Sequence, residues 1–326
     1  MSSARSLFWM VFALLVLLFS TPGVSTNCFA AEKDEPIGPT ILSGFDSPEG
    51  VARDPATGDL FVSNMVVDYS KESAAEKYWG DDKDGYISRL DKTGKVKAKK
   101  WATQIGKVPL SSPKGMAVVG DLLYVCDNSR MAIFSLAKPS EAFVLQFPET
   151  VTLNDVVSDG KKIYTTDTTN EKIYCLDVPK YSKERKGKIE DAKFTTLLGP
   201  PVVNGITLHK NKIYAVSFET GDIYRIDKQG KRAARPLGFA KQFQALDGIA
   251  FSKDGSKIYV SDFKAGKLFR IDLPQRRLVA RNAKPKVSVV LDTGEQTAEF
   301  SYSEEKGKTT IVCPSIQPGK IFILEE

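Results

Sequence analysis

The chain has 326 residues, a formal net charge of +6 and 42% hydrophobic residues, which is typical of a folded globular protein and long enough for one large domain. Lysines and arginines are interspersed with acidic residues along most of the chain, which argues against a nucleic-acid partner. The single histidine excludes a zinc site that is built on several histidines.

Residues 1–31 have the pattern of a secretory signal peptide. Arg5 precedes an apolar run of 13 residues, Leu7–Phe19, and small residues at Ala30 and Ala31 offer a cleavage point. The run is too short to cross a membrane as a helix, which takes about 20 residues. We therefore predict a periplasmic or secreted protein with no membrane attachment after cleavage.

A unit of short strands and turns recurs along residues 32–326. In its clearest copy, the segments Leu246–Phe251, Lys257–Asp262 and Lys267–Asp272 are rich in β-branched and aromatic residues. Successive copies begin 40 to 65 residues apart, a spacing typical of four-stranded propeller blades. The sequence therefore predicts an all-β fold, a six-bladed β-propeller that forms one domain.

The last copy of this unit is one strand short. The strand-like segment 39–45 precedes the first copy and has no strand partner near it in the sequence. We expect this N-terminal segment to complete the sixth blade, because closure of the ring leaves no open sheet edge.

Each unit starts with a residue in an equivalent position. These six residues are Glu49, Lys114, Asn154, Asn204, Asp247 and Glu299. Equivalent positions of propeller blades surround the central axis, so we expect the six side chains to form a ring at one mouth of the tunnel. Carboxylate and amide oxygens without thiolates suit calcium, and the pattern predicts one calcium ion in the ring. Turn chemistry alone accounts for any single Asn or Asp at such a position.

Four of these unit starts carry a resemblance to a known family. The segments are Pro48-Glu49-Gly50, Leu153-Asn154-Asp155, Val203-Asn204-Gly205 and Leu246-Asp247-Gly248. They resemble the blade starts of the senescence marker protein/gluconolactonase superfamily, which includes paraoxonases and squid-type phosphotriesterase. The resemblance covers the whole predicted propeller.

This resemblance implies an activity and a role for each matched residue. Glu49, Asn154, Asn204 and Asp247 would bind a catalytic calcium ion. The small-molecule substrate would be a lactone or a related ester or phosphoester, with Asp247 as general base or nucleophile. Asp155 is a second candidate catalytic carboxylate, one that orients the amide of Asn154. Capping of a turn explains Asp155 equally well.

Two ring residues depart from the family pattern. Lys114 stands where paraoxonase-like relatives carry a histidine, which counts against paraoxonase-type and phosphotriesterase-type activity. Glu299 adds a further negative charge. Lys114 is expected either to bind an anionic group of the substrate or to form an ion pair with Glu299, and we favour the ion pair.

Other residues are candidates for the same face of the propeller. An insertion, residues 66–85, leaves the end of a strand on the ring side, so its Tyr69 and Trp79 are predicted to line a substrate lid or merely to pin the loop. The ends of the second strands supply weaker candidates: Asn64, Asp127, Asp167 and Asp262. His209 lies five residues beyond Asn204 and is expected to be structural, near the other end of the tunnel.

Two other functions fit the same sequence. A non-catalytic propeller of the NHL type would use its face to bind a protein, a glycan or a small ligand. Condensation chemistry of the strictosidine-synthase type uses the same fold without the metal ring. Metal content separates the calcium-dependent hydrolase from both alternatives. The sequence does not indicate an oligomeric state.

Overall fold

The computed structural model describes residues 38–67, 83–147, 152–178, 193–274 and 284–326, which form strands and no helix. Accordingly, these residues contain no helix with the length and apolar character needed to cross a membrane. The predicted signal peptide lies outside the described residues.

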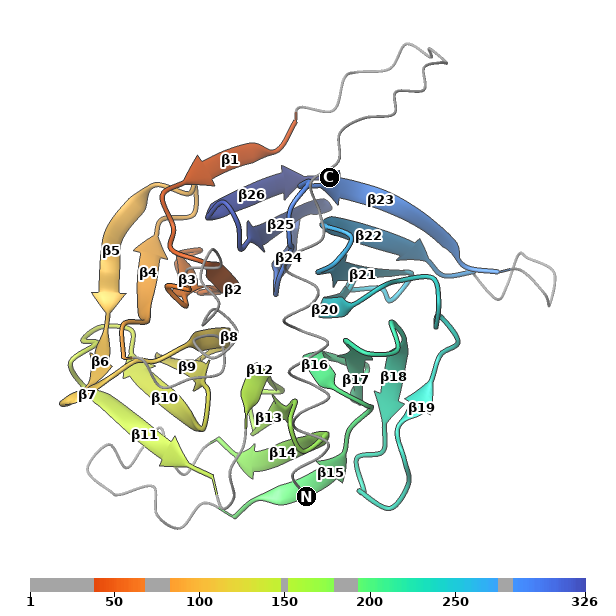
Figure 1. Cartoon of the computed structure of the whole chain (residues 1–326), viewed down its shortest axis with the longest axis horizontal. Helices are drawn as coiled ribbons and strands as arrows, with labels where there is room; N and C mark the ends of the chain where they lie inside the picture. The colour runs from red at the N-terminus through yellow and green to blue at the C-terminus, as the bar shows by residue number, and fades with distance from the viewer. Residues whose placement is uncertain (1–37, 68–82, 148–151, 179–192, 275–283) are drawn as a thin grey trace.

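Six four-stranded antiparallel sheets surround a central axis, as the view down that axis shows (Figure 1). Blade one contains β2 (Pro48–Arg53), β3 (Leu60–Asn64), β4 (Tyr86–Leu90) and β5 (Val96–Ala102). Blade two contains β8 (Pro113–Val119), β9 (Leu122–Asp127), β10 (Arg130–Ser135) and β11 (Ala142–Gln146). Blade three contains β12 (Leu153–Ser158), β13 (Lys162–Asp167), β14 (Lys172–Asp177) and β15 (Thr195–Leu198).

The remaining blades repeat this order. Blade four contains β16 (Val203–His209), β17 (Lys212–Ser217), β18 (Ile223–Ile226) and β19 (Arg235–Pro236). Blade five contains β20 (Leu246–Phe251), β21 (Lys257–Asp262), β22 (Lys267–Asp272) and β23 (Lys286–Asp292). Blade six contains β24 (Ser301–Glu305), β25 (Lys308–Ser315), β26 (Lys320–Glu325) and β1 (Thr40–Ser43), and the hairpin β6 (Gln104–Ile105) and β7 (Val108–Pro109) joins blades one and two. The predicted six-bladed propeller is confirmed.

The sixth blade is closed by the N-terminal strand, as expected from the sequence. β1 pairs antiparallel with β26, with Thr40 opposite Ile323 and Ser43 opposite Lys320. Two ends of the chain thus share one sheet, which removes the open edge that a linear array of blades would have.

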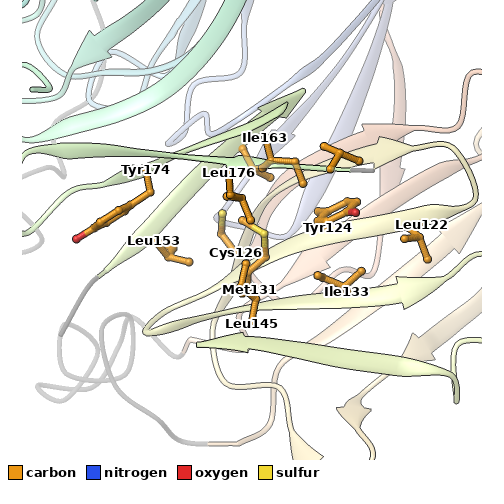
Figure 2. Packing of buried hydrophobic residues seen from close by; sticks show 12 residues of the cluster. Leu122, Tyr124, Cys126, Met131, Ile133, Leu145, Leu153, Ile163, Tyr174 and Leu176 are labelled. Atoms are coloured by element: carbon orange, nitrogen blue, oxygen red, sulfur yellow. The ribbon is translucent and has the colours of Figure 1, made fainter. Parts of the chain in front are cut away.

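The hydrophobic core lies between neighbouring blades. Figure 2 shows one such layer, to which Tyr124 and Met131 of blade two and Leu153 and Tyr174 of blade three belong. Neighbouring blades cover both faces of the strands near the axis, so all six residues of β9 are buried. The outer strand β5 is mostly exposed. Burial of each large apolar side chain contributes about 1.5–3 kcal/mol, and the layers recur around the ring.

The closure of the ring gives a first prediction. Leu42 of β1 packs with Ile323 on the cluster between blades six and one, so Leu42→Ala should lower the free energy of unfolding by about 1–2 kcal/mol. Ile41, the next residue of the same strand, is 51% exposed, and Ile41→Ala should cost less than about 0.5 kcal/mol. Urea unfolding followed by circular dichroism measures both, and equal effects would contradict a role for Leu42 in closure.

Candidate metal and active site

A β-bulge places the ring residue at the start of five inner strands. In β2 the pairing passes from Pro48 opposite Asn64 to Val51 opposite Val62, so that Glu49 and Gly50 share one partner residue. β8, β12, β16 and β20 have the same shift at the same place. A bulge turns the extra residue out of the regular ladder, and here it redirects the ring side chain.

In three blades, a hydroxyl group of the second strand accepts a hydrogen bond from a backbone N–H of the bulge. The amide N–H of Gly50 donates to Ser63 Oγ at 2.7 Å, and that of Gly248 donates to Ser261 Oγ at 2.7 Å. In blade three, the N–H of Asp155 donates to Thr166 Oγ1 at 3.0 Å. A Ser or Thr one residue before the end of the second strand was thus a sequence signal for the bulge, and our sequence analysis missed it.

Glycine follows the ring residue because the inner strands approach one another closely. A Cβ atom on Gly205 would lie 2.2 Å from the carbonyl oxygen of Asp247, and one on Gly50 would lie 2.7 Å from that of Lys114. Neither distance leaves room for a side chain. The glycines that follow the ring residue in blades one, two, four and five therefore let the inner strands converge on the axis.

The ring oxygens are buried and lack hydrogen-bond partners within the described residues. Glu49, Asn154, Asn204 and Asp247 are 0–4% exposed. The partnerless atoms are Glu49 Oε1, Glu49 Oε2, Asn154 Oδ1, Asn204 Oδ1, Asp247 Oδ1 and Glu299 Oε2. Each buried oxygen without a partner costs about 1–3 kcal/mol or more, and buried polar groups are normally paired. All six are oxygen atoms, which accept hydrogen bonds when the carboxyls are ionised, and a bound cation would satisfy them together.

The donor set suits calcium in its chemistry. It consists of carboxylate and amide oxygens, the ligands of hard cations, and the ring contains no sulfur or imidazole ligand. Within the described residues, no group of three or more His, Cys, Asp or Glu side chains could hold a metal ion. A calcium site here therefore depends on the two amides as well as on the carboxylates.

Burial changes the proton affinity of the ring carboxyls. Desolvation, followed by the charges of Asp155 and Asp262, raises the pKa of Asp247 from 3.8 to about 8. Desolvation also raises the pKa of Glu49 well above its usual range, with a further increase from Asp247 and an opposing decrease from Lys114. The carboxyls of blades one, three and five thus affect one another's pKa.

Lys114 does not form the ion pair that we favoured. Its ammonium group is buried and donates to Asn128 Oδ1 at 2.6 Å and to the carbonyl and hydroxyl oxygens of Ser112 at 3.1 Å each. Within the described residues, no ion pair joins Lys114 to Glu299. The reason is their placement, because blade one and its Glu49 stand between the two blades that carry them.

Asp155 has partners other than the expected amide of Asn154. Asp155 Oδ2 accepts a hydrogen bond from the N–H of Ile206 at 2.8 Å, and Oδ1 accepts one from the N–H of Val156 at 2.6 Å. It thus connects blade three to the bulge of blade four, next to Asn204. Burial raises the pKa of Asp155 to about 7. These contacts favour a positioning role over the predicted catalytic one.

The weaker candidates at the ends of the second strands hold the loops on the ring face. Asp127 Oδ1 accepts from the N–H groups of Ser111 and Ser112. Asp262 accepts from the N–H groups of Gln244 and Ala245 in the same way. These carboxylates therefore have structural roles in the turns that precede the ring residues.

An apolar cluster covers part of the ring face. It joins the start of the insertion to loops of blades four, five and six. Its members are Met65, Val67, Ala245, Phe263, Ala298 and Ile316, with Phe218 packed against them. The insertion thus begins on the ring side, as expected, whereas Tyr69 and Trp79 lie outside the described residues.

His209 is remote from this chemistry. It lies at the end of β16, and its ring stacks on Phe251 with a centroid distance of 4.7 Å. This packing agrees with the structural role predicted for it.

Comparison with known proteins identifies the fold alone. No protein-family model and no curated protein matches the chain. Regucalcin from Agrobacterium tumefaciens, described as a calcium-binding protein, matches its structure with a TM-score of 0.59 and 14% identity over 89% of this chain and 93% of its own. Virginiamycin B lyase from Staphylococcus aureus matches with a TM-score of 0.54 and 14% identity over 88% and 98%. Luciferin-regenerating enzyme matches with a TM-score of 0.56 and 15% identity over 88% and 95%.

The chain shares a propeller fold with these proteins. Their names describe a calcium-binding protein, a lyase and a regenerating enzyme, so the shared fold does not select one chemistry. The ring and its surroundings, and not the fold, therefore determine the chemistry.

The buried carboxyls predict how stability depends on pH. Because the pKa of Asp247 is about 8 in the folded chain against an ordinary 3.8, the folded chain binds more protons than the unfolded chain between these values. In a chelator, stability should therefore fall as the pH rises from about 5.5 to 8. Excess calcium, which favours the ionised carboxylates, should remove most of that fall. Thermal melts in EDTA and in calcium across this range measure the effect.

Other titrating groups do not mask this effect. The pKa of Asp254 on the surface is lowered to about 2, so its contribution changes only below the chosen range. His209 has a lowered pKa and titrates alike with and without calcium, so its contribution cancels in the difference between the two melts. A calcium stabilisation that stays constant or shrinks as the pH rises would contradict cation binding by the buried carboxyls.

Proposed function

We propose that this protein is a calcium-dependent hydrolase that opens a lactone or cleaves an ester at the ring. The observation that carries the proposal is the set of buried oxygens without partners, supplied by five of the six blades. We further propose, from the signal-peptide pattern of residues 1–31, that it acts in the periplasm or outside the cell on a small-molecule substrate.

Glu49, Asn154, Asn204 and Asp247 would hold the ion. When bound, calcium would polarise the carbonyl oxygen of the substrate. We assign the role of general base to Asp247, the role that the resemblance of Leu246-Asp247-Gly248 implies for this position. It accepts a proton from the attacking water. After the water oxygen bonds to the acyl carbon and the carbon–oxygen bond breaks, Asp247 returns the proton to the leaving alkoxide.

The surroundings of the ring support a neutral substrate with an apolar part. Phe263 and Phe218 belong to the apolar cluster on the ring face, and their rings lie 5.5 Å apart. An ammonium group carries three N–H donors, and Lys114 directs its donors to three oxygen atoms of the chain. Binding of a substrate carboxylate by Lys114 would have to displace one of these hydrogen bonds.

A second candidate function is a binding propeller in which the ring has only a structural role. The burial of Glu49 and Asp247, at 0% and 2% exposed, favours it, because structural ions are enclosed by protein ligands. Both functions require the cation, and only the hydrolase requires turnover.

Ring variants separate these two functions. Asp247→Asn removes the base and Asn204→Ala removes a ligand, and each should lower hydrolysis of the best substrate by at least about a hundredfold. His209→Ala is the control and should keep hydrolysis within about twofold, because this side chain packs away from the ring. Release of acid from a panel of lactones and aryl esters in calcium measures the rates. Full activity in both ring variants would refute the site.

The apolar cluster gives a separate prediction for substrate binding. Phe263→Ala removes a large apolar side chain from this cluster and should raise KM for apolar esters by about tenfold with a smaller change in kcat. Phe194→Ala, in the layer between blades two and three, removes a similar ring from a distant place and should leave KM unchanged. Equal changes in KM would show that general loosening, and not substrate contact, causes the effect.

A further inference from the structure

Lys114 is a fixed positive charge inside the ring. It is 0% exposed and stands one blade away from Glu49, whose pKa it lowers. Its ammonium group is held by Ser112 and Asn128, so it cannot swing away when a cation approaches without giving up those hydrogen bonds. A bound cation would therefore experience its repulsion.

Glu299 is a buried carboxyl group on the other side of Glu49, and it carries a negative charge when it is ionised. It is 8% exposed, and Oε2 has no hydrogen-bond partner within the described residues. A Cβ atom on Gly205 would lie 2.9 Å from Oε2, and one on Gly248 would lie 3.1 Å from both carboxylate oxygens. The carboxylate thus sits against the glycines that directly follow Asn204 and Asp247.

These two charges do not neutralise each other by contact. Glu49 of blade one lies between them in the ring order. Burial, followed by the charges of Asp155, Asp247 and Glu49, raises the pKa of Glu299 well above its usual range. Each charge therefore acts on the ring independently, Lys114 from blade two and Glu299 from blade six.

We propose that Lys114 and Glu299 set the calcium affinity of the ring in opposite directions, so that the extra positive charge and the extra negative charge offset each other. This inference rests on the proposed function, since it assumes that the ring binds calcium. Lys114 weakens binding by repulsion, and Glu299 strengthens it by attraction. Both side chains are buried, so little water screens their effect on a divalent ion in the ring.

The two charges would thus act on calcium affinity, whereas an ion pair would stabilise the fold. The parent chain, which has both charges, would bind calcium about as tightly as a variant that has neither charge. Loss of one residue should then shift the affinity, and loss of both should restore it.

Calcium titration calorimetry of the chelator-treated, purified full chain at about pH 8 tests this. We expect Lys114→Met to tighten calcium binding by at least about tenfold and Glu299→Gln to weaken it by at least about tenfold. The double variant should bind within about threefold of the parent chain, as charges that act on one ion should partly cancel. Lys138→Met removes an exposed lysine and should change nothing.

The outcomes separate this inference from the proposed function. If the parent chain binds calcium and both single variants bind it equally well, the inference is wrong and the calcium site stands. Weaker binding by Lys114→Met would also overturn it, because Lys114 would then support the site. No calcium binding by the parent chain would overturn both. If Lys114→Met fails to give a cooperative melt in EDTA, Lys114→Gln keeps a polar group for Ser112 and Asn128 and takes its place.

Discussion

The close approach of six inner strands to one axis is the constraint on which this structure depends. It requires glycine after the ring residue in most blades, since a Cβ on Gly205 would lie 2.2 Å from the Asp247 carbonyl oxygen. It also requires the bulge, because a regular ladder alternates its side chains between the two faces of the sheet. The two features together bring polar side chains of separate blades into one buried space.

That convergence creates an electrostatic cost, and the chain offers several ways to reduce it. Burial raises the pKa of Asp247 to about 8, so protonation can remove charge. Lys114 supplies one positive charge. A bound divalent cation would satisfy the partnerless oxygens as well as the charge, which neither of the other two does. The proposed binding of a cation and the proposed catalysis by that cation therefore rest on the same set of residues.

Different residues determine the fold and the function. Propellers with 14–15% identity to this chain share its architecture and carry names from different chemistries. Packing between blades accounts for the architecture, since each layer needs only apolar side chains of suitable size. The chemistry depends on a few ring positions, and Lys114 and Glu299 are the two at which this chain departs from the pattern that its blade starts resemble.

The sequence by itself determined the blade count, the closing strand and the six ring positions, because repeated strand patterns and turn residues are local and each repeat supports the others. Only the tertiary structure decided the partners of the buried side chains. Lys114 turned out to bind Ser112 and Asn128 instead of Glu299, and Asp155 turned out to connect two blades. Such contacts join residues of different loops and blades, so they follow from how neighbouring blades pack, and no local pattern records that packing.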